Sequence, residues 1–417
     1  MHRLTSERGA VLLHVILATI MLIGINVFVI DYGVMWVGRN QAQNAADAGA
    51  MAGAIALAYD DFDDRTDTGP AKVFAWQTSQ QNWVWGQAPK VNITTDVTFP
   101  VIPDDPCVDT TCVRVDVYRD NAGANPLPAL FGGAVGVTGS GVKAMAIARW
   151  GAANASDCLK PFAIPDKWFD HYDDPANSNP VDVDTWKSDD YFDLVYPNGS
   201  KLGKQGTPIP SADRDVYVPP SKTSTGTGFT LANDLGTKVV LYYGKPTDSP
   251  SPGNFLPIDL PKADGSVSSG AADYSAAIAN CTGAPVAIGD ILQTEPGAMK
   301  GPTDSGIDAL IAKDPLATWD STNNAVTNSC AQAATPCAKV SPRIVAIPVF
   351  NTNQYETDRL NGKSDIQIVN ILGFFIDSHN AKGDITGYFT SIPGLLVAGK
   401  PSINKDSGFA KVIMLVR

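Results

Sequence analysis

The chain opens with a single long apolar run. Residues Ala10 to Ile30 read AVLLHVILATIMLIGINVFVI, and about 20 apolar residues are enough to cross a hydrocarbon core of ~30 Å as a helix. The polar residues His14 and Asn26 each lie about one turn from an end of the run, where their side chains can reach toward the headgroups. We therefore expect residues 10–30 to form a transmembrane helix.

Charged residues on either side of this run predict its orientation. Arg3 and Arg8 precede the run, whereas Asp31 follows it and the next cation is Arg39. The cytoplasmic flanks of membrane helices carry an excess of Lys and Arg. The pattern predicts a cytoplasmic N-terminus over residues 1–9 and export of everything from Asp31 onward.

Two kinds of N-terminal processing would change this picture. The run is longer than the ~7–15 residues of a signal-peptide core, and no small-x-small cleavage site follows it closely. Arg8-Gly9-Ala10 has the look of a prepilin junction, but prepilins usually carry Glu at the fifth mature position, where this chain has His14. We expect the helix to stay uncleaved, and a processed minor pilin is the alternative.

The helical pattern continues beyond the membrane. Residues 31–61 contain no proline and are rich in Ala, Gln and Met, so their helix propensity extends the helix to about Tyr59. Small residues recur on it at spacings of three and four, which lets another backbone approach closely. These residues are Ala42, Ala45, Ala46, Gly49, Ala52, Gly53 and Ala56. Such a face suits a partner helix or the protein's own next elements, and both interpretations stay open.

Polar positions in this helix resemble a known family. Arg8-Gly9-Ala10, Asp31-Tyr32-Gly33 and the stretch RNQAQNAADAGA over residues 39–50 resemble the N-terminal signature of TadG-like proteins, which are grouped with the TadE/G-like proteins of the tight-adherence (Flp) pilus system. The signature positions are Arg8, Gly9, Asp31, Gly33, Arg39, Gln43, Ala45, Ala46 and Asp47. The resemblance implies a non-enzymatic bacterial inner-membrane protein with periplasmic or cell-surface domains. It also implies a role in pilus biogenesis, adherence and biofilm formation, with pilus-assembly proteins or pilins as partners.

Shorter patterns follow the long helix. A second helix is predicted over residues 70–82, strands over 91–99, 113–118 and 142–149, and a short helix over 127–132. The alternation of the strands suits a small antiparallel sheet that buries one face against the long helix. We expect residues 31–152 to form an exported helix and a pilin-like domain.

Beyond a small, polar stretch near residue 157 the chain is dense in turns. Strands are predicted at 239–243, 255–260, 343–350, 366–376, 384–389 and 410–416, and a helix at 304–313. Residues 371–376 are apolar on both faces, which is typical of a central strand in a closed or sandwiched sheet. The sequence predicts an α+β protein whose residues 157–417 are a β-rich domain with an irregular insertion at about 160–280.

Cysteine usage favours an oxidising compartment. Six cysteines without a Cys-x-x-Cys pair fit disulfides better than zinc, although buried reduced thiols would look the same. Six cysteines permit 15 pairings. We hypothesise Cys107–Cys112 and Cys330–Cys337 as local pairs and Cys158–Cys281 as one long tie.

Composition and motifs argue against several functions. A net charge of −12 without a Lys/Arg cluster disfavours nucleic acid. No common nucleophile or zinc motif is present, and Gly362-Lys363-Ser364 lacks the earlier glycine of a phosphate loop, so we expect no nucleotide. We predict no catalytic, metal or cofactor site. A membrane-tethered enzyme is the alternative, and it would gather His171 or His379 with a carboxylate such as Glu295 in a deep pocket.

An acidic stretch at residues 170–193 and two Asp-Ser pairs are rich in possible metal ligands. The acidic stretch comprises Asp170, Asp173, Asp174, Asp182, Asp184, Asp189, Asp190 and Asp193. The calcium-loop order Asp-x-Asp-x-Asp-Gly is absent from it, so a solvated loop is expected. Asp304-Ser305-Gly306 and Asp320-Ser321-Thr322 break the Asp-x-Ser-x-Ser motif of the von Willebrand A domains found in some TadG-like proteins.

Overall fold

The computed structural model describes residues 6–60, 64–103, 107, 111–132, 136, 139–170, 191–195, 208–211, 214–245, 248–359, 363–380 and 382–416, without the side chains of residues 6–10 and Val27. The chain forms two compact units, residues 1–150 with 413–417 and residues 151–412. It passes from the first unit to the second within strand β5 (Val142–Ala152) and returns within β20 (Ala410–Leu415).

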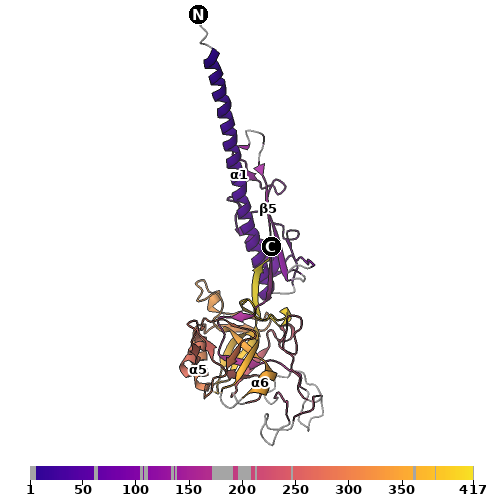
Figure 1. The fold of residues 1–417 in the computed structure, drawn as a ribbon, viewed down its shortest axis with the longest axis vertical. Coiled ribbons are helices and arrows are strands. Elements are labelled where there is room, and N and C mark those ends of the chain that lie inside the picture. Colours follow the sequence, from indigo (N-terminus) through magenta and orange to yellow (C-terminus); the bar gives the residue numbers. More distant parts are fainter. Residues whose placement is uncertain are drawn as a thin grey trace. The chain divides into compact units, whose positions relative to one another are not determined.

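The first unit is built on one continuous helix (Figure 1). Its elements are α1 (Ser6–Tyr59), α2 (Pro70–Gln81), β1 (Val97–Thr98), β2 (Cys112–Arg119), β3 (Leu127–Pro128), β4 (Gly139–Ser140) and β5. At ~1.5 Å per residue the 54 residues of α1 extend over roughly 80 Å. The predicted extension of the helix to Tyr59 is confirmed.

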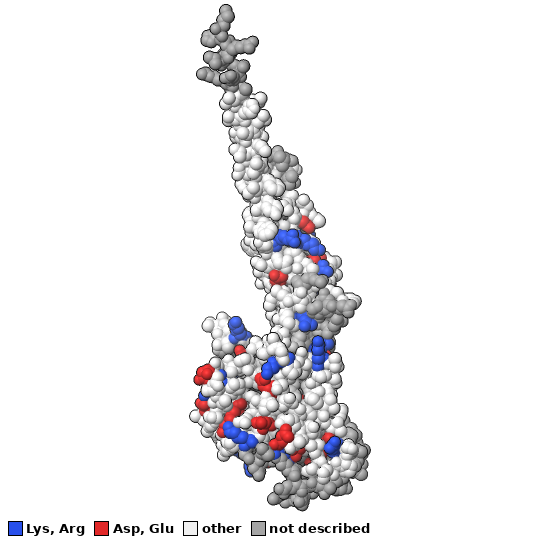
Figure 2. Space-filling model, in the orientation of Figure 1, with Lys and Arg blue, Asp and Glu red and all other residues white. Residues whose placement is uncertain are grey.

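The first half of α1 presents apolar side chains without protein contacts around most of its circumference. Leu13, Ile20 and Phe28 are exposed by 57%, 61% and 69%, and residues 11–30 contain no Lys, Arg, Asp or Glu (Figure 2). By length and composition this helix can cross a membrane. The Asn26 amide donates to the Leu22 carbonyl at 2.8 Å, so it is satisfied within the helix rather than by reaching for headgroups, because helical side chains lean toward the N-terminus.

The second half of α1 is packed against its own unit. Ala42, Ala45 and Ala46 have no exposed surface. A Cβ added at Gly49 would lie 2.9 Å from the Ala75 carbonyl oxygen of α2. The small-residue face therefore docks onto the protein's own elements, which favours the intramolecular interpretation over a partner helix.

A small sheet covers this face of α1. Strands β1, β2 and β5 are antiparallel neighbours in that order. Val113, Val115 and Val117 of β2 are fully buried, and because alternate residues share a face, all three point to the same side. A Cβ at Gly53 of α1 would lie 2.8 Å from Val113 Cγ1, so that side is the one against the helix.

Two predicted elements of this unit are wrong. Of the strand expected over 91–99, only β1 forms, because the Asn92 and Asp96 side chains bond the backbone N–H groups of Thr94 and Asn92 and close a turn. The helix expected over 127–132 is absent. There β3 pairs with β4 instead, and the N–H groups that follow bond a side chain of α1, as described below.

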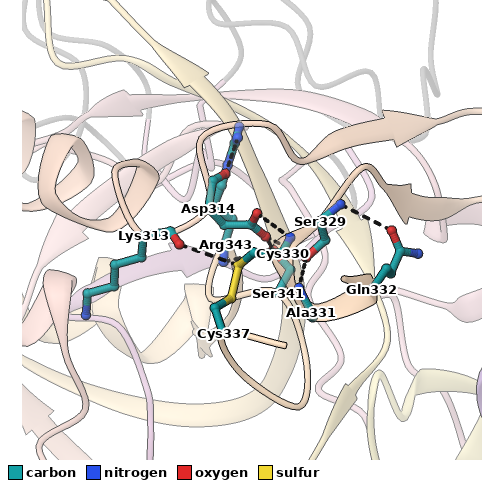
Figure 3. Close-up of a disulfide and its surroundings, with 9 residues drawn as sticks. All are labelled: Lys313, Asp314, Ser329, Cys330, Ala331, Gln332, Cys337, Ser341 and Arg343. Atoms are coloured by element: carbon teal, nitrogen blue, oxygen red, sulfur yellow. Dashed lines mark hydrogen bonds between the residues drawn. A yellow bond between two sulfur atoms is a disulfide. The ribbon is translucent and has the colours of Figure 1, made fainter. Parts of the chain in front are cut away.

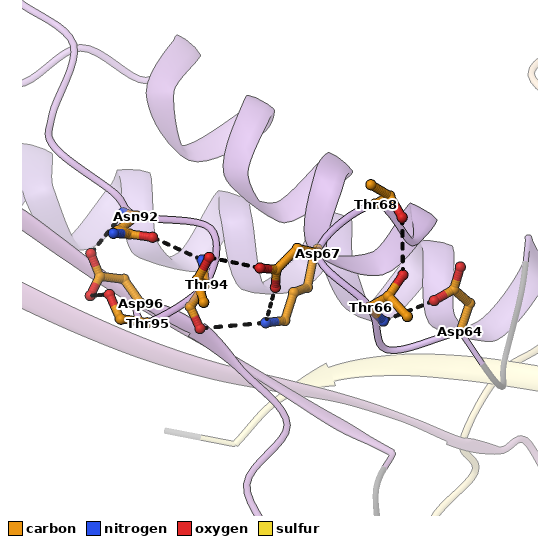
Figure 4. A network of polar contacts seen from close by, with 9 residues as sticks. Asp64, Thr66, Asp67, Thr68, Asn92, Thr94, Thr95 and Asp96 are labelled. Carbon is orange, nitrogen blue, oxygen red and sulfur yellow. Dashed lines mark hydrogen bonds and ion pairs between the residues drawn. The ribbon is translucent and has the colours of Figure 1, made fainter.

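A polar network fixes the same turn to the start of α2 (Figure 4). Asp67 receives hydrogen bonds from Lys72 Nζ at 2.8 Å and Thr94 Oγ1 at 2.7 Å. These two side-chain hydrogen bonds lower the pKa of Asp67. The residues between α1 and α2 are thereby joined to the turn that precedes β1.

The second unit is rich in short strands. Its elements are β6 (Ala155–Ser156), β7 (Phe162–Pro165), α3 (Leu231–Asp234), β8 (Lys238–Tyr243), β9 (Asn254–Pro257), β10 (Leu260–Pro261), β11 (Val267–Ser268), α4 (Ala271–Ala279), β12 (Val286–Ala287), β13 (Ile291–Gln293), α5 (Lys300–Ile311), β14 (Thr318–Asp320), β15 (Ala325–Thr327), the 3₁₀ turn η2 (Cys330–Gln332), β16 (Ile344–Phe350), α6 (Thr352–Asp358), β17 (Asp365–His379), β18 (Ile385–Thr390), β19 (Ile392–Pro393), the 3₁₀ turn η3 (Lys405–Ser407) and β20.

Six of these strands close into a barrel. The order is β17-β16-β7-β9-β8-β18, the pairing of β17 with β18 closes the ring, and β13 extends it at β17. Strand β17 serves two cores, since Leu372 and Phe374 pack in one cluster and Ile368 and Ile371 in another. The alternation shifts by one residue at the bulge opposite Val349 and Phe350. The presence of two cores explains why the strand is apolar on both faces. The expected α+β class is confirmed, and of the closed or sandwiched sheet that the pattern allowed, the closed one forms.

The turn-dense stretch at about 160–280 contributes to this barrel. It supplies β7, β8 and β9, and α4 packs beside α5 with Tyr274 and Ile278 in the first core cluster. Helix α5 begins at Lys300, before the predicted residue 304, because Pro302 falls within its first turn, where a missing N–H costs little.

The cysteines are joined in three disulfides. Their Cα atoms lie 5.6 Å apart for Cys107–Cys112, 4.6 Å for Cys158–Cys281 and 5.5 Å for Cys330–Cys337. The first belongs to the first unit and the other two to the second. These are the pairs hypothesised from the sequence.

Buried polar groups position the third disulfide (Figure 3). Asp314 accepts hydrogen bonds from Ser329 Oγ at 2.6 Å, Ser341 Oγ at 2.5 Å and the Cys330 N–H at 2.8 Å. Burial opposes ionisation, but these bonds outweigh it and lower the pKa of Asp314. Arg343 donates to the carbonyl oxygens of Asp314 and Ala317 at 3.1 and 2.9 Å.

Candidate functional site

Asp31 lies where the apolar run of α1 ends, and it captures a distant loop. Its carboxylate accepts the backbone N–H groups of Leu130 at 2.9 Å, of Phe131 at 3.2 and 3.3 Å, and of Gly132 at 2.6 Å. Hydrogen bonds from neutral donors to a carboxylate are stronger than those between neutral groups. We call residues 127–132 the Asp31 loop.

The same loop is held a second time by close packing. Leu127 is fully buried, and a Cβ added at Gly38 would lie 2.6 Å from Leu127 Cδ1. Because Gly38 has no side chain, Leu127 can pack directly against the backbone of α1. The sequence analysis did not single out Gly38, and a glycine within a helix-forming stretch was the only signal available.

Gln43 and Asp47 join α1 to the sheet. Gln43 Nε2 donates to Asp47 Oδ1 at 2.7 Å and to the Met145 carbonyl of β5 at 3.1 Å. Gln41 Oε1, two residues before Gln43 on α1, accepts the Trp85 N–H at 2.7 Å. These polar side chains thus fix neighbouring backbone segments at defined positions along the axis of α1.

The other signature positions make fewer contacts. Ala45 and Ala46 lie in the buried face. At Gly33 no atom lies within 4 Å of an added Cβ. Arg39 is exposed, and at Arg8 and Gly9 the structure describes only the helical backbone. The structure therefore brings Asp31, Gln43, Ala45, Ala46 and Asp47 into intramolecular contacts.

These contacts fasten a helix rather than prepare a reaction. Each named polar group bonds a backbone group or a neighbouring side chain, which positions an element but activates no nucleophile or water. The arrangement is that of a long helix, able by length and composition to cross a membrane, to which a small sheet is fastened.

His379 is the described histidine on which the enzyme alternative depends. Its Nε2 lies 2.8 Å from Asp308 Oδ1, and its Nδ1 lies 3.4 Å from Asp304 Oδ1, on the surface of α5. His171 lies outside the described residues. Glu295 is not part of this cluster, since it accepts the Gly270 N–H at 3.1 Å.

Glu295 instead belongs with a second carboxylate. The pKa of Asp259 is raised to about 6. Burial is the largest cause and the hydrogen bond with Glu295 comes next, while Lys363, whose Nζ lies 2.5 Å from the carboxylate, partly opposes them. Lys363 comes from the segment that resembles the end of a phosphate loop. Its ammonium is thus paired with a carboxylate of its own chain.

Only the ends of the acidic stretch are described. The pKa of Asp193 is raised to about 7. Burial is the largest cause and the charges of Glu356 and Asp170 add to it, while the Arg359 charge partly opposes them. The six aspartates between Asp170 and Asp193 lie outside the described residues. Among the described residues, no group of three His, Cys, Asp or Glu side chains is placed to hold a metal ion.

A groove of about 450 Å³ lies beside the Cys158–Cys281 disulfide and is lined in part by Lys160, Lys313 and Pro342. Burial, and then the neighbouring Lys313 charge, lower the pKa of Lys160 to about 7. Its Nζ donates to the Asn280 carbonyl at 2.9 Å. This lysine therefore ties the disulfide region to the end of α4.

By its fold and site, the protein is an α+β protein mounted on a helix able to cross a membrane. Residues 9–56, which include all of the signature positions except Arg8, match the family described as "Putative Flp pilus-assembly TadE/G-like". The predicted recognition of this family is confirmed for that segment. Comparisons with curated proteins and with solved structures found no match.

Proposed function

We propose that the protein is a non-enzymatic, TadG-like component of the Flp pilus assembly system, anchored in the bacterial inner membrane. The observation that carries this proposal is the family match over residues 9–56. In the same segment Asp31, Gln43 and Asp47 build the joint between the helix and its domain.

The proposed location is a single pass with the N-terminus in the cytoplasm and both units in the periplasm or at the cell surface. The exposed apolar half of α1 and the Arg-rich side before it support this orientation. The three disulfides support an oxidising compartment for the part after Asp31.

The proposed partners are other pilus-assembly proteins or pilins, and the expected outcome of the interaction is pilus biogenesis, surface adherence and biofilm formation. The face of α1 opposite its packed side supports a binding role. It carries the exposed residues Trp36, Met51 and Ile55. We propose neither nucleic acid nor nucleotide as a ligand.

Deletion and complementation test the role. A strain that lacks the gene should lose or alter its pili and adhere less, and the wild-type chain should restore both. As a matched pair, Gln43→Ala should complement poorly at normal membrane levels, because the bond to Met145 is lost, whereas Asn44→Ala on the exposed side should complement fully. Normal piliation and adherence in the deletion strain would refute the proposed role.

We also propose that α1 is retained whole rather than processed after Gly9. His14 stands at the position where prepilins usually carry Glu. The intact mass of the membrane-extracted protein should include residues 1–9. A mass that begins at Ala10 would support a minor pilin instead.

A further inference from the structure

The Asp31 loop exposes large apolar side chains at the end of the membrane helix. Leu130 and Phe131 are 54% and 46% exposed. Their backbone N–H groups bond to Asp31, the first residue after Ile30. The hydrogen bonds therefore fix two apolar side chains at the height where the predicted transmembrane run ends.

Aromatic side chains of α1 mark the same height as an interface. Phe28 and Tyr32 stack with ring centroids 6.0 Å apart, and Tyr32 and Trp36 are 55% and 60% exposed. Tyr and Trp concentrate where a membrane meets water. The loop thus lies beside an aromatic belt.

The hydrogen bonds to Asp31 also satisfy polar groups that would be poorly hydrated at a membrane surface. A carboxylate at a membrane boundary loses water, and three backbone N–H groups replace it here. The same bonds satisfy three donors that would otherwise need water or lipid headgroups. What the loop then presents outward includes Leu130 and Phe131.

We propose that the Asp31 loop is a second membrane contact of this protein, with Leu130 and Phe131 entering the headgroup region of the leaflet on the exported side. The lipid surface is the occupant because the loop continues the lipid-facing surface of α1 at the level of Asp31. Together, α1 and the loop hold the first unit at one height and angle above the bilayer. The inference rests on the membrane-anchoring part of the proposed function.

Lipid-quenching measurements on the full chain in vesicles of phosphatidylethanolamine and phosphatidylglycerol test this contact. The native cysteines are all paired, so an environment-sensitive dye labels only an introduced thiol. The labelled variants are Leu130→Cys in the loop, Ile20→Cys in the middle of the membrane run, and Phe74→Cys on α2. Phe74 is 45% exposed, similar to Phe131, but its neighbour Ala75 packs at Gly49, roughly 27 Å beyond Asp31 along the helix.

Nitroxide lipids labelled near the headgroup should quench the Leu130 dye about threefold more than the Phe74 dye, because interfacial segments bury ~5–10 Å into that layer. Adding Asp31→Ala should reduce the quenching at Leu130 toward the Phe74 level and leave Ile20 quenched by deep nitroxides. Unchanged quenching at Leu130 in the Asp31→Ala chain would overturn the role assigned to the carboxylate.

The Ile20 dye separates the two ways of failing. Quenching at Ile20 but equal, weak quenching at Leu130 and Phe74 would overturn the loop contact and leave the anchor intact. Absence of quenching at Ile20 would overturn the anchor and the inference with it. A Leu130 dye that is shielded only at high protein-to-lipid ratio, without lipid quenching, would indicate a second copy of the chain there and would also overturn the proposal.

Discussion

Replacing Gly49 by alanine should weaken the joint between α1 and the rest of the first unit. The added Cβ would lie 2.9 Å from the Ala75 carbonyl oxygen and 2.9 Å from Ser79 Cβ, so α2 must shift. Overpacking of this kind costs ~1–3 kcal/mol, whereas alanine gains about 1 kcal/mol in helix propensity over glycine. Because one of the blocking atoms belongs to a backbone, we expect a net loss of about 1–2 kcal/mol.

Gly33→Ala provides the matched control on the same helix. No atom lies within 4 Å of a Cβ at Gly33, so only the propensity gain of about 1 kcal/mol should appear. The assay is brief proteolysis of the full chain in detergent micelles over a urea series, read by cleavage between α1 and α2. With m-values of ~1–3 kcal/mol/M, a loss of about 1–2 kcal/mol lowers the urea midpoint by roughly 0.3–2 M.

The comparison of the two variants decides whether the packed face is correct. Gly49→Ala should unfold at lower urea than the wild-type chain, and Gly33→Ala at equal or higher urea. If both variants raised the midpoint alike, then α2 would not lie against Gly49, and the intramolecular docking of the small-residue face would be refuted.

Three further predictions concern the disulfides and buried charges. Cys158→Ala should destabilise the second unit by about 4–5 kcal/mol, whereas Cys107→Ala should destabilise the first unit by about 2 kcal/mol. The difference arises because the two disulfides join residues separated by 123 and 5 positions in the sequence. Equal losses of stability in urea unfolding would contradict this reasoning. The pKa of Asp193 in the folded protein is raised to about 7, so ionising this carboxyl destabilises the fold as the pH rises from about 4 to 7. Asp193→Asn should therefore be more stable than wild type at pH 8 by at most about 4 kcal/mol, with a smaller difference at pH 5. A difference in melting temperature that does not change with pH would count against this reasoning. Arg343→Met leaves buried carbonyls without their donor and should cost about 3 kcal/mol or more; a melting temperature within a degree or so of wild type would argue that the arginine is dispensable.

Elements with a strong repeating pattern were predictable from the sequence. Helix α1 is long, free of proline and apolar at its start, so its end near Tyr59 could be predicted. Strands β16 and β17 are long apolar runs, and residues 371–376, which are apolar on both faces, predicted a central strand of a closed or sandwiched sheet. The barrel strand β7 has only four residues, too short a pattern to read before its pairing partners are known.

The candidate site was predictable by position but not by contact. The resemblance marked Asp31, Gln43 and Asp47, yet the Asp31 loop lies about a hundred residues away in sequence, and nothing local links the two. Helix propensity at residues 127–132 was overridden because their N–H groups bond a carboxylate of another element. The turn at Asn92 was missed because side-chain bonds to the backbone compete with a strand and leave alternation unchanged.

The compartment of the chain after Asp31 is the central claim about this protein. A protease-sensitive tag placed after Arg417 can be compared in intact cells, in spheroplasts and in lysed spheroplasts, with the protein followed in the carbonate-washed membrane pellet. The account predicts a tag that is degraded in spheroplasts on a chain that stays in the pellet. A tag that survives in spheroplasts and is degraded only after lysis, or a chain released into the soluble fraction, would contradict it.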